Sequence, residues 1–138
     1  MMDIFILDAC ALIATLNDEN GSDRTEDILQ RAEDKKCLIY MNKLNLLEVY
    51  YVIYRKAGIN KADEILFELL NTPLIVIDKL GDDVFREAGK LKAEYKISLA
   101  DSIALAEAKV REAQLVTCDH HEFDIIDRNG DVKFHRIR

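Results

Sequence analysis

Two aspartates follow apolar runs of the kind that form buried strands. Asp8 comes directly after Ile4–Leu7, and Asp119 lies two residues after the run Leu115–Thr117. In an open sheet of parallel strands, ligands bind beyond the carboxyl ends of the strands. If these two runs are neighbouring strands, their acids point into one crevice.

Two further acids stand on expected helices. Asp101 lies three residues after Ser98, in the first turn of a helix, where the partial positive charge helps to keep a carboxylate ionised. Glu48 lies within the expected helix Asn42–Lys56 among apolar neighbours, and no lysine or arginine stands three or four residues away to pair with it. A carboxylate in such a setting is costly to bury unless it is paired or binds a metal.

The chemistry that suits these acids is metal-dependent hydrolysis of a phosphodiester. Mg²⁺ prefers oxygen ligands, and a bound Mg²⁺ or Mn²⁺ polarises a phosphoryl oxygen and lowers the pKa of its water. We expect Asp8 and Asp101 to be the principal metal ligands, with Asp119 completing the site. Glu48 is expected either to bind the metal through water or to orient the attacking water. The pattern leaves open whether one or two metal ions act.

Taken singly, each acid also has a structural interpretation. Asp8 can cap the helix that follows it, and Asp101 can return the capping hydrogen bond of its own helix. Asp119 can be a turn residue, and Glu48 can lie on the solvated edge of its helix. The order of the four acids along the chain is what favours a shared site.

The residues around Asp119 add weaker candidates. Thr117 either orients Asp119, contacts phosphate or is simply a strand-end hydroxyl, and Asp124 is either an outer acid or ordinary surface. The pair His120–His121 suggests zinc, but adjacent residues chelate poorly and the sequence has no suitably spaced third ligand.

The three cysteines, Cys10, Cys37 and Cys118, form an odd set without Cys-x-x-Cys spacing. This argues against both a zinc site and a disulfide framework, so we expect reduced thiols. No sequence feature provides a base that would make Cys118 a nucleophile.

Short apolar runs alternate with helical patterns, which is typical of an α/β fold with a mainly parallel sheet covered on both faces. The expected strands are 4–7, 37–41, 74–77, 115–117 and, more weakly, 132–135 after an Asn129–Gly130 turn. The expected helices are 9–16, 22–35, 42–56, 60–70, 82–95 and one that begins at Ser98. Alanines in this last helix indicate close packing on the sheet.

The totals fit one ordinary domain over residues 1–138. The chain is 49% hydrophobic and 33% charged, which is enough for a core without disulfides or a structural metal. We expect a cytoplasmic protein, because no apolar stretch approaches the ~20 residues that cross a bilayer and the start lacks the features of a signal peptide. The net charge of −7 argues against a module that binds nucleic acid by electrostatics alone, but not against a nuclease whose metal supplies positive charge.

Four segments, in order, resemble the motifs of the PIN domain, and in particular of the small VapC-type toxins of bacterial and archaeal toxin–antitoxin pairs. They are Ile6–Ala14 with Asp8, Leu46–Val49 with Glu48, Ser98–Ala106 with Asp101, and Leu115–Asp124 with Thr117-x-Asp119. The resemblance extends from Asp3 to about Phe134, and four ordered motifs are far more specific than any one of them. Cys10 departs from the pattern, since many relatives carry Ser, Thr or Asn there and a thiol binds metal-coordinated water poorly.

The resemblance implies a three-layer α/β/α sandwich with four or five strands, bound Mg²⁺ or Mn²⁺, and cleavage of RNA. It also implies a homodimer and a tightly bound antitoxin that blocks the site. Basic residues that could contact RNA, although each is by default a solvated charge, are Arg24, Lys43, Arg55, Lys56, Arg136 and Arg138. Tyr50, Tyr51 and Tyr54 can stack on bases, but a core or a subunit interface is the favoured interpretation.

Two other classes of protein stay open at this point. A catalytically silent PIN-like domain that binds a protein would be free to lose the four acids, so their presence argues against it. A phosphate-accepting receiver domain has a sheet of the same type, and Ile75–Lys79 imitates part of its pattern. The receiver interpretation leaves Glu48 without a role.

Overall fold

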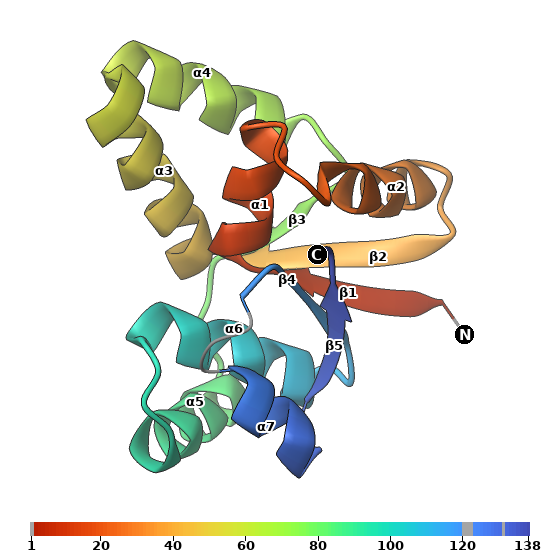
Figure 1. Ribbon diagram of the computed structural model, residues 1–138, viewed down its shortest axis with the longest axis vertical. Coiled ribbons are helices and arrows are strands. Elements are labelled where there is room, and N and C mark those ends of the chain that lie inside the picture. Colours follow the sequence, from red (N-terminus) through yellow and green to blue (C-terminus); the bar gives the residue numbers. More distant parts are fainter. Residues whose placement is uncertain (1, 120–122, 131) are drawn as a thin grey trace.

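The computed structural model describes residues 2–119, 123–130 and 132–138. Within these residues the chain forms five strands and seven helices (Figure 1). The strands are β1 (Asp3–Leu7), β2 (Cys37–Asn42), β3 (Ile75–Ile77), β4 (Gln114–Thr117) and β5 (Lys133–Arg136). The helices are α1 (Ala9–Leu16), α2 (Ser22–Glu33), α3 (Lys43–Ala57), α4 (Ile59–Leu70), α5 (Asp82–Glu94), α6 (Leu99–Val110) and α7 (Phe123–Asn129).

The strands pair in the order β3-β2-β1-β4-β5, and every pair is parallel. β1 is therefore the central strand, and the carboxyl ends of all the strands meet at one edge. Leu7, the last residue of β1, is in register with Val116 of β4. The segments that carry Asp8 and Asp119 therefore leave the sheet side by side.

Helices cover both faces of the sheet, so the expected α/β/α sandwich is confirmed. Helices α1 to α4 lie on one face and α5 to α7 on the other (Figure 1). In β1, Phe5 and Leu7 are buried in the core under the first group, whereas Ile6 is buried in the core under the second. A strand that faces a core on both sides must be apolar throughout, which explains the unbroken apolar run.

Helix α6 packs as its composition predicts. Ala104, Ala106 and Ala108 are completely buried. Ser98 caps the helix, because its hydroxyl accepts a hydrogen bond of 3.1 Å from the N–H of Asp101. This cap fixes the first turn, from which Asp101 projects.

Two features differ from the sequence expectations. The pattern does not predict α7, because seven residues are too few to show a helical period. Tyr51 and Tyr54 of α3 are exposed, so a place in the core is wrong for these two residues. No helix in the described parts of the chain is long and apolar enough to cross a membrane.

Candidate functional site

Asp8 lies at the junction between β1 and α1. Its N–H donates to the carbonyl of Val116 in β4, and its carboxylate accepts a 2.8 Å hydrogen bond from the N–H of Ala11. Asp8 is therefore the cap of α1, as its structural interpretation proposed, and it is only 2% exposed. Capping and metal binding are compatible, because a carboxylate has two oxygens.

Thr117 connects Asp8 with Asp119. The Thr117 side chain is hydrogen-bonded to the Asp8 carboxyl, and its Oγ1 accepts a 3.0 Å hydrogen bond from the N–H of Asp119. Thr117 is fully buried. One hydroxyl thus contacts the segments that follow β1 and β4.

Glu48 and Asp101 lie on two helices that are joined by a buried asparagine. Asn45, one turn before Glu48 in α3, donates a 3.0 Å hydrogen bond from Nδ2 to the carbonyl of Ala100, the neighbour of Asp101. Asn45 is only 1% exposed, and its Oδ1 has no hydrogen-bond partner among the residues that the structure describes. In the sequence, Asn45 stands out only as a polar residue inside an apolar helical run. The sequence does not indicate its hydrogen-bond partner, Ala100, which lies 55 residues away.

Three of the four acids interact electrostatically. The pKa of Asp8 is raised to about 7, above all by burial and to a smaller extent by the charges of Asp101 and Asp119, although hydrogen bonds from Thr117 and Ala11 lower it. Burial alone also raises the pKa of Glu48, which is partly buried. The negative charge of Asp8 is thus unfavourable, because the side chain is buried and interacts with two further carboxylates.

This arrangement fits a hydrated divalent cation. Within residues 2–119, 123–130 and 132–138, no three acidic, histidine or cysteine side chains form a group that could hold a metal ion. Mg²⁺, however, keeps several of its waters and needs only one or two direct carboxylate ligands. The carboxylate oxygens of Asp8, Asp101 and Asp119 are hard donors of the kind that Mg²⁺ prefers, and a cation beside them would offset the charge of the buried Asp8.

The Asp8 pKa predicts a pH dependence of stability in EDTA. The native carboxyl keeps its proton up to about pH 7, whereas the unfolded value is near 3.8. The native state therefore binds more protons between these values, and its stability falls as the pH rises through this window, by as much as about 4 kcal/mol. Denaturant titrations of the wild type and of Asp8→Asn from about pH 4 to pH 8 should converge at low pH and diverge at high pH, with the variant more stable. Parallel curves would contradict the assigned pKa.

Arg136 is a residue of this region whose role sequence reasoning missed. It was a candidate for RNA contact or a solvated charge, yet its side chain is only 19% exposed. It donates to the carbonyl of Asp119 at 2.7 Å and to Oδ1 of Asp124 at 2.8 Å. Asp124 is thus in an ion pair with Arg136. No local signal exists for these contacts, because the partners lie 17 and 12 residues away in other elements.

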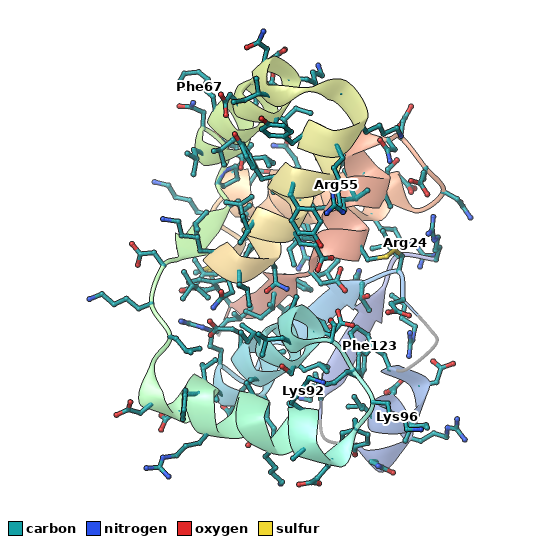
Figure 2. All side chains as sticks on the ribbon, turned by 90° about the vertical axis from the view of Figure 1, so that its left-hand side faces the viewer. Arg24, Arg55, Phe67, Lys92, Lys96 and Phe123 are labelled. Carbon is teal, nitrogen blue, oxygen red and sulfur yellow. A yellow bond between two sulfur atoms is a disulfide. The ribbon has the colours of Figure 1, made fainter. Side chains whose placement is uncertain are left out.

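The expectation of three reduced thiols is wrong. Cys10 of α1 and Cys118 form a disulfide, with their Cα atoms 6.0 Å apart, and Cys37 remains as a buried free thiol (sulfur is yellow in Figure 2). The two residues are 108 positions apart, so spacing could not reveal the pair. In this state Cys10 has no S–H group with which to bind a metal-coordinated water.

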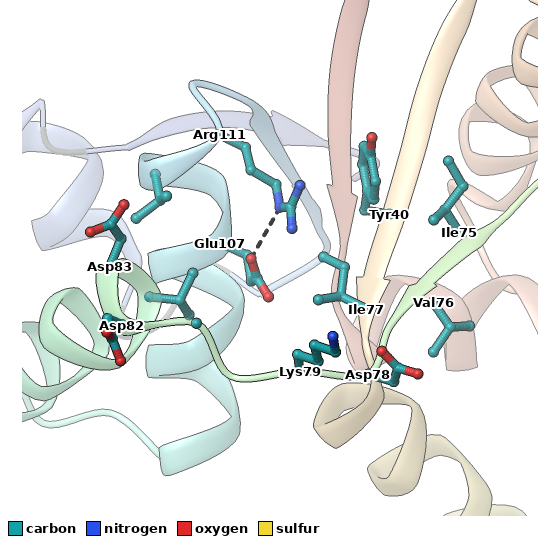
Figure 3. A pocket seen from close by; sticks show the side chains of 13 residues that line it. Tyr40, Ile75, Val76, Ile77, Asp78, Lys79, Asp82, Asp83, Glu107 and Arg111 are labelled. Atoms are coloured by element: carbon teal, nitrogen blue, oxygen red, sulfur yellow. Dashed lines mark hydrogen bonds and ion pairs between the residues drawn. The ribbon is translucent and has the colours of Figure 1, made fainter.

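A separate cavity of about 550 Å³ lies between β3, α5 and α6, and none of the four acids lines it (Figure 3). Its inner wall includes the buried Glu107, which accepts hydrogen bonds from Nδ2 of Asn42 at 2.8 Å and from Nε of Arg111 at 3.1 Å. Asn42 caps α3 through the N–H of Leu44. Glu107 therefore joins α6 to the start of the helix that carries Glu48.

The pair His120–His121 lies outside the described residues. The receiver interpretation is wrong, because Asp78–Lys79 follows the edge strand β3, whereas a phosphate-accepting aspartate belongs to a central strand.

Solved structures share this fold at low sequence identity. VapBC from Salmonella typhimurium, solved bound to DNA, is 15% identical with a TM-score of 0.75, covering 100% of both chains. VapBC2 from Rickettsia felis is 18% identical with a TM-score of 0.73, covering 96% of this chain and 98% of that one. VapC20 from Mycobacterium tuberculosis, described as a toxin that cleaves the sarcin–ricin loop, is 17% identical with a TM-score of 0.65, covering 88% and 94%.

Comparison with curated proteins found no match. The family model of the PIN domain matches residues 5–129, a range that spans nearly the whole chain and within which all four acids lie. The motif resemblance, the parallel sheet and this match agree, and the chain belongs to the PIN domain family.

Proposed function

We propose that this protein is a metal-dependent ribonuclease. The observation that carries the proposal is the electrostatic coupling of Asp8, Asp101 and Asp119 at the carboxyl edge of the sheet, with Asp8 buried and its pKa raised to about 7. A divalent cation would offset these charges. The PIN family assignment and the oxygen-only donor set support the same conclusion.

The four acids have different proposed roles. Asp8, Asp101 and Asp119 would hold Mg²⁺ or Mn²⁺, and Glu48 would orient the attacking water. The cation supplies charge neutralisation at the phosphate and a more acidic water. Thr117 positions Asp8 and Asp119 relative to each other through the hydrogen bonds described above. Cys10 and Asp124 would not contact the metal, because Cys10 is in the disulfide with Cys118 and Asp124 is paired with Arg136.

The biological setting is part of the same proposal. The shared fold with VapBC structures supports the toxin component of a toxin–antitoxin pair, acting in the cytoplasm as a homodimer. Its partners would be an RNA substrate and an antitoxin that blocks the site. VapC20, a toxin of this fold, cleaves the sarcin–ricin loop, which supports a structured RNA as substrate.

The test is cleavage of a mixed RNA pool by the purified chain with Mg²⁺, with Mn²⁺ and with EDTA. We expect cleavage with metal, none with EDTA, and a loss of at least about 100-fold in Asp101→Asn. Asp78→Asn, an exposed aspartate after β3, is the matched control and should cleave like the wild type.

The alternative is a catalytically silent domain that binds a protein. Folded wild-type chain that neither cleaves any RNA nor binds Mn²⁺ in calorimetry would favour this alternative and overturn the ribonuclease. Mn²⁺ binding without cleavage of the pool would instead indicate a nuclease of narrow substrate range.

A further inference from the structure

A covalent link joins the two segments that carry acids of the site. Cys10 lies two residues after Asp8, in the first turn of α1, and Cys118 lies directly before Asp119. Their disulfide therefore connects the Asp8 cap to the residues after β4. Cys118 also stands between Thr117 and Asp119, whose mutual hydrogen bond spans it.

We propose that the Cys10–Cys118 disulfide is a redox-modification site, reduced by a dithiol, and that its state sets the cation affinity of the acid site. The second half of this inference rests on the proposed metal site. In the cytoplasm, the location proposed above, disulfides are usually catalytic or redox-sensing, and this one adjoins the acids rather than a distant part of the fold.

The two cysteine residues differ in exposure, which favours attack at one end of the disulfide. Cys10 is partly exposed, whereas Cys118 is only 6% exposed. A thiolate of the dithiol attacks Sγ of Cys10, the S–S bond breaks, and Cys118 leaves as a thiolate that takes up a proton. The second thiolate of the reductant then attacks its partner sulfur in the mixed disulfide and releases Cys10. The protein gains two electrons and two protons, and the dithiol becomes a disulfide.

Reduction acts on the site through the position of Asp119. Reduction removes the covalent link between the first turn of α1 and Cys118, so the position of Asp119, the next residue, becomes less constrained. Arg136 still holds the carbonyl of Asp119 from β5 at 2.7 Å. Because this second tether remains, we expect weaker cation binding rather than its loss, about tenfold, as for contacts that orient metal ligands.

The experiment compares the full chain in its oxidised form with the same chain reduced by dithiothreitol and desalted without air. Alkylation in denaturant should modify one cysteine of the oxidised chain, Cys37, and all three of the reduced chain. Calorimetric titration with Mn²⁺ should show about tenfold weaker binding after reduction, restored by reoxidation.

Two variants separate the disulfide from general thiol effects. Cys37→Ser keeps the disulfide and should retain the redox-dependent affinity. The double variant Cys10→Ala with Cys118→Ala should bind like the reduced wild type in both conditions. The reduced wild type carries the test by itself if the double variant does not fold.

Each failure has its own signature. Three modifiable thiols after mild oxidation, or equal Mn²⁺ affinity in both forms, would overturn the redox inference and leave the proposed ribonuclease intact. No Mn²⁺ binding in either form would overturn the metal site and with it the coupling, while the thiol count would still report the disulfide.

Discussion

Replacing Asp8 with asparagine is expected to lower RNA cleavage by at least about 100-fold, because loss of one of the proposed direct metal ligands would remove roughly 3 kcal/mol of transition-state stabilisation. Asparagine has the same shape and can still accept the 2.8 Å hydrogen bond from the N–H of Ala11, so the cap of α1 is retained. Single-turnover cleavage rates at saturating Mg²⁺ would measure the effect.

The fold provides an internal control for this variant. Because burial and the neighbouring acids oppose the charge of Asp8, the neutral side chain should make the protein more stable above pH 7 in EDTA. A variant that is both inactive and more stable distinguishes a functional acid from a structural one. An Asp8→Asn protein that cleaves RNA at more than a tenth of the wild-type rate would contradict the role of Asp8.

Replacing Glu107 with alanine is expected to destabilise the protein by about 2–4 kcal/mol, because it leaves the buried amide of Asn42 without its acceptor, removes the ion pair with the partly exposed Arg111 and opens a cavity. Glu107 is completely buried, and its two oxygens serve Asn42 and Arg111 (Figure 3). The guanidinium of Arg111 lies 4.7 Å from the ring centroid of Tyr40 and so cannot simply swing away without losing that contact. Thermal unfolding should shift down by roughly 10 °C.

Two matched variants serve as controls for the effect of Glu107→Ala on stability. Glu107→Gln keeps an oxygen for Asn42 and the side-chain volume, so it should cost clearly less than alanine. Glu64→Ala removes an exposed pair with Lys61, whose side chains are 57% and 50% exposed, and should change stability by less than about 1 kcal/mol. If Glu107→Ala lowered the free energy of unfolding as little as Glu64→Ala, the hydrogen bonds of Glu107 would contribute nothing measurable to stability.

The order and direction of the elements were readable from local patterns. Unbroken apolar runs such as Ile4–Leu7 predict strands with a core on both faces, and the alanines after Asp101 predict a helix packed on the sheet. Both are confirmed. The short helix α7 was not predicted, because its seven residues are too few to show a helical periodicity.

The features of the candidate site also fall into those that local sequence patterns predict and those that depend on tertiary contacts. The sequence by itself determined which acids follow strands or open helices, because those positions depend on neighbouring residues. Only the tertiary structure decided that Cys10 meets Cys118, that Arg136 holds Asp119, and how far the pKa of Asp8 rises. The physical reason is that these contacts join residues far apart in the chain and that burial depends on every layer of the fold, so no local pattern encodes them.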